Sequence, residues 1–174
     1  MIFDAPYVVG FRDGARLVSQ LNLPGTALQL GDRSFQVVEV EIRLSTVGFG
    51  VSPNLLRYEF VSPWVPLSQK NFKKYRDMPL TARSYELDRI AIGNILTAMR
   101  GLSIEFPERL FAAFAARRSI TCRYKDQEFA GFLGTLVTNA VLPDHLAIGR
   151  AVSHGYGWLM HAECEGERAC RSAG

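Results

Sequence analysis

The segment LDRIAIGNILTAMRGL, at residues 87–102, holds the pattern that decides the fold. Its apolar residues recur at helical spacing and would share one face; they are Leu87, Ile90, Ala91, Ile95, Ala98 and Met99. This spacing predicts a helix over residues 84–100, which Gly101 can end. Gly93, inside the helix, suggests that the helix packs closely on a sheet.

Patterns typical of β-strands lie on both sides of this helix. Residues 55–61 form an extended run that Pro63 and Pro66 end. After the helix, apolar and polar residues alternate from Ile120, and a tight turn leads into a strand near residues 128–137. A final strand is expected at residues 157–164.

The stretch PERLFAAFAARR, within residues 106–118, is ambiguous because it has helical propensity and a proline at a helix start position. When that stretch is left unassigned, the expected elements from residue 55 onward are, in order, strand, helix, strand, strand, glycine-rich crossover and strand. This order predicts an α+β fold of the ferredoxin-like, βαββαβ type.

The N-terminal part contains weaker signals. We expect a strand at residues 6–11, a helix at 13–21, and strands at 26–30 and 35–44 around the turn Gly31-Asp32-Arg33. The last strand alternates strongly, and one buried face is predicted to hold Val38, Val40, Ile42 and Leu44. Residues 1–54 would thus be part of a preceding ferredoxin-like unit, residues 55–164 the C-terminal unit, and residues 165–174 a flexible tail.

Composition limits the class of protein. The chain has 174 residues, and 48% of them are apolar, which is more than a disordered chain carries. Three cysteines without a CxxC spacing argue against a disulfide framework and a zinc site, so reduced thiols in a cytoplasm are expected, with no metal or cofactor. The sequence has no apolar run of membrane-spanning length and no cleavable leader pattern, so we expect no membrane association.

A mildly basic net charge of +3 is compatible with nucleic-acid binding but does not establish it. The distribution of charge is more informative. One basic cluster lies in a short helix that Ser68 can cap, and its polar residues are Lys70, Asn71, Lys73, Lys74 and Arg76. Phe72 and Tyr75 interleave with these residues, as in surfaces that bind single-stranded RNA, although a solvated helix face is the alternative. A second cluster comprises Arg117, Arg118, Arg123 and Lys125.

The crossover LPDHLAIGRAVSHGYGW, at residues 142–158, is rich in glycine and in groups that bind RNA. The candidate residues there are Gly149, Arg150, Ser153, His154, Gly155, Tyr156 and Gly157. Glycine permits close approach of the main chain to phosphate, arginine supplies charge, and tyrosine can stack on a base. The loop is not a P-loop, and a tight connection to the last strand is the simpler interpretation.

Four segments together resemble the CRISPR-associated endoribonucleases that process repeat RNA, a family within the RAMP superfamily. They are PYVVGFRDGARLV at residues 6–18, RYEFVSPWVPLSQKNFKKYR at 57–76, LDRIAIGNILTAMRGL at 87–102, and the glycine-rich crossover. The resemblance implies a ferredoxin-like RAMP fold, with extended chain at residues 106–118. It also implies binding of CRISPR repeat hairpin RNA, and metal-independent cleavage by attack of a ribose 2′-OH on the adjacent phosphate.

The chain departs from that family in its histidines. Members usually carry a catalytic histidine upstream of the first of these segments, whereas here that segment begins within five residues of Met1. The three histidines of this chain are His145, His154 and His161. The gene is therefore short, the start is misplaced, or the catalytic groups differ. His154 is the first catalytic candidate, although the family often has arginine there, and Tyr75 and Lys74 are substitutes as base and cation.

Two other functions stay open. The chain could be a non-catalytic RNA-binding RAMP protein that retains guide RNA with the proteins of a CRISPR effector complex. It could also be a ferredoxin-like protein-interaction domain.

Overall fold

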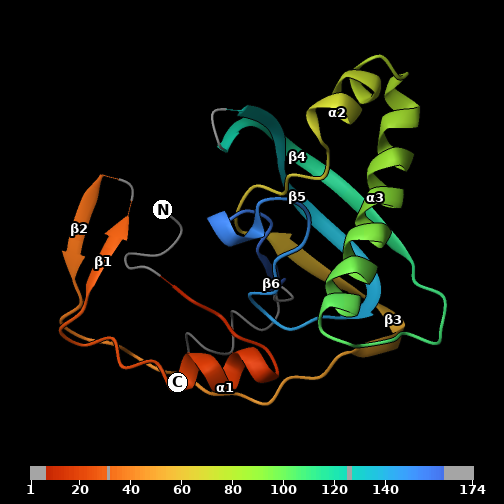
Figure 1. The fold of residues 1–174 in the computed structure, drawn as a ribbon. Coiled ribbons are helices and arrows are strands. Elements are labelled where there is room, and N and C mark those ends of the chain that lie inside the picture. Colours follow the sequence, from red (N-terminus) through yellow and green to blue (C-terminus); the bar gives the residue numbers. More distant parts are fainter. Residues whose placement is uncertain (1–6, 31, 125–126, 163–174) are drawn as a thin grey trace, which may run out of the picture. The chain divides into compact units, whose positions relative to one another are not determined.

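The computed structural model describes residues 7–30, 32–124 and 127–162 (Figure 1). The chain divides into two compact units, one over residues 3–47 and one from Gly48 onward. The second unit thus begins before residue 55, because its first strand, β3, begins at Gly50. The tail expected at residues 165–174 lies outside the described residues.

The first unit contains a short helix and a hairpin. Helix α1 spans Asp13–Ser19, and strands β1 (Ala27–Leu30) and β2 (Arg33–Gln36) pair antiparallel. The predicted helix is confirmed, but the strand expected at residues 6–11 is wrong, because residues 7–11 take no strand conformation.

The second strand is also much shorter than predicted. It ends at Gln36, and beyond it Val38 is 89% exposed and Leu44 is 75% exposed. The alternating pattern is present in the sequence, but none of the described strands pairs with residues 38–48. Without a neighbouring strand, alternation alone does not bury a face.

The second unit is built on a four-stranded antiparallel sheet in the order β4-β5-β3-β6. Its strands are β3 (Gly50–Phe60), β4 (Ala112–Tyr124), β5 (Gln127–Val141) and β6 (Leu159–His161). Helices α2 (Gln69–Arg76) and α3 (Leu80–Gly101) lie between β3 and β4 in sequence. This order is that of a ferredoxin-like unit, so the predicted fold is confirmed.

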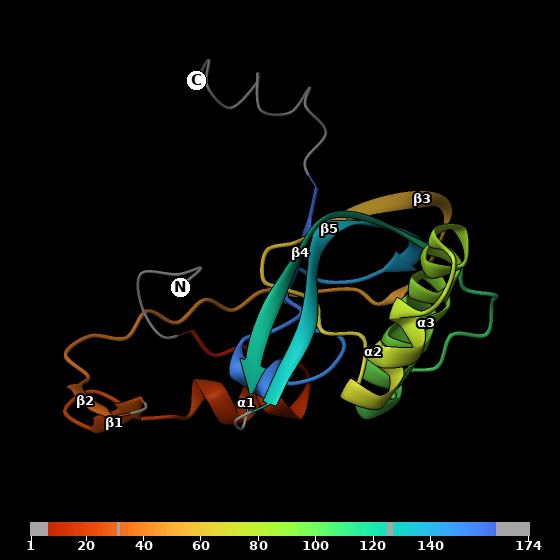
Figure 2. The ribbon, with the colours of Figure 1, turned by 90° about the horizontal axis from the view of Figure 1, so that it is seen from above.

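The second connection departs from the standard unit. Where a helix would return the chain from β5 to the last strand, the glycine-rich crossover contains only the short 3-10 helix η1 (Val152–His154). Helices α2 and α3 cover one face of the sheet, and the crossover lies against the other (Figure 2).

The ambiguous segment is extended from Ala112, so the helical alternative is wrong. The neighbouring strand supplies the reason, because every residue from Ala112 to Ala116 pairs with β5. Helix α3 adds a further contact, in which the Phe114 N–H donates to Asp88 Oδ1 at 2.7 Å. Tertiary pairing therefore overrides local helical propensity.

The core lies between α3 and the sheet. The buried residues of α3 are Leu87, Ala91, Ile95 and Met99, as the helical spacing predicts. Trp64, with no exposed surface, stacks on Phe60 and donates from Nε1 to Asn94 Oδ1 at 3.2 Å. It is a core residue and not a platform for a base. Gly93 is exposed, so the prediction that it packs on the sheet is wrong.

Candidate nucleic-acid interface

The glycine-rich crossover forms a compact loop held at both ends. The Arg150 N–H donates to Val65 O at 3.0 Å, and the Gly157 N–H donates to Pro63 O at 2.9 Å. Ala151 and Gly155, on either side of η1, both have positive φ, at 54° and 84°. These two residues turn the chain sharply, so residues 152–154 form the tip of the loop.

The three predicted glycines have different roles. A Cβ on Gly149 would lie 2.8 Å from Trp64 Cδ1, and one on Gly157 would overlap the Ile148 carbonyl oxygen. Both glycines are therefore required by packing inside the protein. A Cβ on Gly155 would meet none of the described atoms within 4 Å, so this glycine faces open space that a ligand can approach.

The tip of the loop presents polar side chains to solvent. Arg150, Ser153 and His154 are all exposed. Ser153 Oγ lies 3.0 Å from His154 Nδ1, a hydrogen bond that can fix the orientation of the imidazole. Together these groups can supply a cation for phosphate and a group able to accept or donate a proton.

Tyr156 points from the loop to the hairpin of β4 and β5. Its hydroxyl donates to Arg123 O at 3.0 Å, and the buried Cys122 lies beside it in the wall of the same pocket. Burial raises the pKa of Tyr156, so the phenol keeps its proton near neutral pH. Tyr156 thus fastens the loop to the hairpin, with part of its surface left accessible.

Helix α2 carries the basic cluster as predicted. Ser68 caps it by accepting from the Asn71 N–H at 3.3 Å. The predicted RNA-binding residues of this helix are all exposed: Lys70, Asn71, Lys73, Lys74 and Arg76. Phe72 and Tyr75, which were expected to interleave with the cations, are half-buried and line a pocket together with Phe132.

Tyr75 is one of these half-buried residues. Its ring packs edge-on against Phe132 with the centroids 6.0 Å apart, and the Arg83 guanidinium lies 5.7 Å from the ring centroid. Burial raises the pKa of Tyr75, with a smaller opposing effect from Arg83. With a raised pKa the phenol keeps its proton near neutral pH, so it is a poorer general base there.

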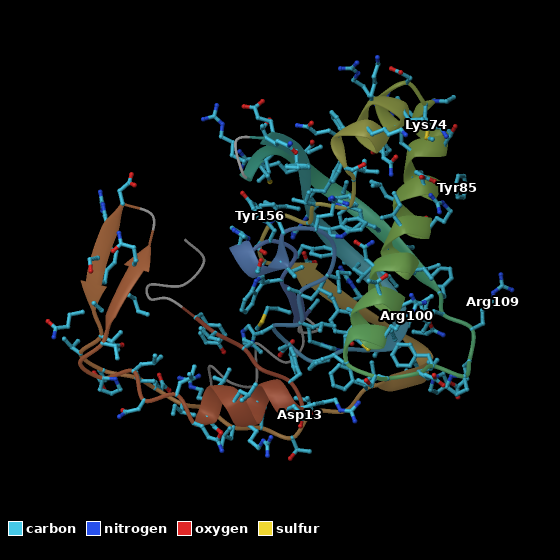
Figure 3. All side chains as sticks on the ribbon, viewed as in Figure 1. Asp13, Lys74, Tyr85, Arg100, Arg109 and Tyr156 are labelled. Carbon is cyan, nitrogen blue, oxygen red and sulfur yellow. The ribbon has the colours of Figure 1, made fainter. Side chains whose placement is uncertain are left out.

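The structure places α2 and the loop on opposite faces of one hairpin. Tyr75 contacts Phe132, whereas Tyr156 contacts Cys122, which pairs with Phe129. Side chains alternate along β5, so Phe129 and Phe132 point to opposite faces. The candidates Lys74 and Tyr75 therefore form no common cluster with His154. Helix α2 and the crossover lie on different sides of the hairpin (Figure 2), and Figure 3 shows Lys74 of α2 and Tyr156 of the loop far from each other.

The edge strand β4 lies between these two groups and carries exposed arginines, Arg117, Arg118 and Arg123. Arg117 forms an ion pair with Glu59, which in turn accepts from Thr135 Oγ1 at 2.6 Å. The register shifts between Ala116 and Arg118, so Arg117 occupies a β-bulge. The sequence shows this basic cluster but not the β-bulge that orients it. The fourth member of the cluster, Lys125, lies outside the described residues.

The described part of the chain contains neither a metal cluster nor a membrane-spanning helix. Within residues 7–30, 32–124 and 127–162, no three His, Cys, Asp or Glu side chains are grouped so as to hold a metal ion. No helix there is both long and apolar enough to cross a bilayer.

Comparisons with known proteins identify a family for the chain and a relative of similar length. A family model described as the Cas6b C-terminal domain matches residues 50–162. An uncharacterized protein of Methanocaldococcus jannaschii is 32% identical over 146 residues, which make up 84% of this chain and 95% of that protein.

Two solved structures are similar to the chain. One, a crystal structure of Cas6b, has a TM-score of 0.63 and 32% identity, and the match covers 66% of this chain and 59% of that one. The other is described as the crystal structure of the CRISPR RNA processing endoribonuclease Cas6b. It has a TM-score of 0.72 and 26% identity, and the match covers 86% of this chain and 71% of that one.

Proposed function

Since the chain belongs to the Cas6b family, we propose that it binds CRISPR repeat RNA and takes part in its processing. The observation that carries the proposal is the glycine-rich loop, which presents Arg150, Ser153 and His154 at an exposed tip. The site of action is the cytoplasm, where repeat transcripts are made.

The binding surface is a basic band around the hairpin of β4 and β5. It begins on α2 with Lys70, Lys73, Lys74 and Arg76, continues along β4, and ends at Arg150. Because β4 is the edge of the sheet, a strand of RNA can pass around it from one face to the other. Cations and backbone amides in such a band bind the phosphates.

The proposed reaction is scission of the RNA strand by attack of a ribose 2′-OH on the adjacent phosphate. The O–P bond to the next nucleotide breaks, the 2′ proton goes to a base, and the leaving 5′ oxygen takes a proton from an acid. His154 is proposed as one of these two groups, with Arg150 stabilising charge on the phosphate.

One observation favours a second candidate function. The other predicted catalytic groups, Tyr75 and Lys74, lie on the far face of the sheet from His154, so the described residues do not assemble a complete acid–base pair from the three. A chain of this kind could bind repeat RNA without cutting it, and so retain guide RNA with other proteins of a CRISPR complex.

The test is incubation of the whole chain, in EDTA, with end-labelled repeat RNA from its own genomic locus. His154→Ala is compared with Val152→Ala, a matched change at an exposed apolar residue of the same 3-10 helix. A defined cut that leaves a 2′,3′-cyclic phosphate and is lost only in His154→Ala supports the catalytic role.

A cut that persists in both variants supports the nuclease activity and contradicts a catalytic role for His154. Salt-sensitive binding without any cut supports the RNA-retaining alternative. Failure to bind the repeat RNA contradicts both functions.

A further inference from the structure

A cavity of about 450 Å³ lies between the glycine-rich loop and the hairpin of β4 and β5. Pockets that hold small organic ligands have volumes of roughly 300 to 1,000 Å³. The loop supplies Gly149, Arg150, Ala151 and Tyr156 to its wall, and the hairpin supplies Cys122, Gln127 and Phe129. Val65 completes the lining.

The cavity is held open by bonds within the protein. On one side the Arg150 N–H bonds to Val65 O, and on the other the Tyr156 hydroxyl bonds to Arg123 O, both at 3.0 Å. Gly149 lies against Trp64, which is fully buried. The loop therefore cannot collapse into the cavity without breaking these contacts.

The wall combines aromatic and hydrogen-bonding groups. Phe129 and Tyr156 offer ring surfaces, and the exposed amide of Gln127 can both donate and accept. Cys122 adds no negative charge, because burial raises the pKa of its thiol. Arg150 lies at the loop surface, where it can meet a phosphate.

This combination fits a flat heterocycle attached to a phosphate. RNA is read with sequence specificity mainly through unpaired bases, which stack on aromatic side chains and bond along their edges. A lipid chain would not use the Gln127 amide, and an acidic peptide would not use the two rings.

We propose that this cavity receives one unpaired base of the bound RNA, with Arg150 holding the phosphate beside it. The inference rests on the proposed RNA-binding function and adds to it a subsite for a single base. That base lies on the face of the sheet that carries His154, and not on the face covered by α2.

The test is a scan of the repeat RNA with a single abasic nucleotide placed at each unpaired position in turn. In the wild-type chain, one position should weaken binding about fivefold to a hundredfold, the range expected for loss of one base stacked on an aromatic ring. The same scan is made on Phe129→Leu, which keeps an apolar residue in the wall, and on Gln127→Ala, a change at an exposed residue. At that position, the loss of affinity caused by the abasic nucleotide should fall to less than about twofold in Phe129→Leu. In Gln127→Ala this loss should be smaller than in the wild-type chain.

Thr121→Ala is the matched control, because Thr121 is exposed on β4 but does not line the cavity. It should keep the wild-type abasic profile. One outcome is that the wild-type chain and the two cavity variants bind the RNA and lose the same affinity at every abasic position. That result would contradict the base subsite but would leave the proposed RNA binding intact. If the wild-type chain does not bind the RNA, the proposed function and the subsite are both wrong.

Discussion

Gly155 and Gly157 are two residues apart and share a positive φ, yet the surrounding atoms give them different tasks. Gly157 is required because its neighbour, the Ile148 carbonyl, occupies the space of a Cβ, whereas Gly155 borders open space. The sequence shows both glycines but not the atoms next to them. Their different roles therefore could not be predicted from the spacing.

We predict that Gly155→Ala weakens RNA binding more than folding, and that Gly157→Ala does the reverse. Both variants carry backbone strain of about 1–2 kcal/mol from a non-glycine residue at positive φ. Only Gly157→Ala adds a steric overlap inside the protein, and only Gly155→Ala places a methyl group in the ligand's path. Thermal unfolding and RNA titration of the two variants measure the contrast, and equal losses of melting temperature would contradict it.

Tyr75 gives a second prediction at this scale. We expect Tyr75→Phe to leave RNA cleavage and binding within about twofold of wild type, because the ring packs on Phe132 and the raised pKa makes the hydroxyl a poor base. Tyr75→Ala should instead destabilise the fold by removing that packing. A large loss of cleavage in Tyr75→Phe would return Tyr75 to the catalytic site.

Among the elements, α3 and the hairpin of β4 and β5 show what periodicity can predict. The buried face of α3 follows directly from the spacing of Leu87, Ala91, Ile95 and Met99. The segment at residues 106–118, which contains the start of β4, could not be assigned, because its helical propensity is opposed by strand pairing that only the folded chain supplies. The same limit explains the error at residues 38–44, where alternation exists without a described partner strand.

The exposed position of Gly93 on α3 leads to a stability prediction. A Cβ there would meet no described atom within 4 Å, and the residue lies in a helix interior. Gly93→Ala should therefore raise the free energy of unfolding by about 0.5–1 kcal/mol, since alanine loses less backbone entropy on folding. Denaturant unfolding measures the change, and a decrease in stability would mean that the helix packs against something at Gly93.

The basic cluster on α2 has its own prediction. Lys70→Ala combined with Lys73→Ala should flatten the dependence of RNA affinity on salt, by about 0.7 in log–log slope for each RNA phosphate that the variant no longer neutralises. Arg100→Ala, at the exposed C-terminal end of α3, is the control and should leave the slope unchanged. An unchanged slope in the double variant would remove α2 from the binding surface.

At the scale of the whole molecule, the order of elements was sufficient to predict a ferredoxin-like unit. The arrangement of the candidate site was not predictable, because the face on which each side chain lies depends on register and on the path of the crossover. The bulge at Arg117, for example, belongs to the pairing of β4 with β5 and has no signal in the sequence pattern. The predicted site residues therefore lie against one hairpin but on its two opposite faces.

The contrast between the two units predicts a contrast in hydrogen exchange. Backbone amides of β5, which pairs with β3 on one side and β4 on the other, should exchange slowly. Amides of residues 38–46, which lie in no described strand, should exchange close to the rate of an unfolded chain. Strong protection of residues 38–46 in the isolated protein would show that another strand covers them.

The loop between Gly149 and Gly157 also bears on how such a protein can change over generations. Its two ends are fixed by packing, while the residues between them support neither a strand pairing nor the core under α3. Apart from Tyr156, which fastens the loop to the hairpin, residues 150–155 can therefore be substituted without unfolding the sheet. When the sequence of the repeat RNA changes during evolution, the protein can adapt by substitutions in this loop. The sheet and helices that hold the loop need not change.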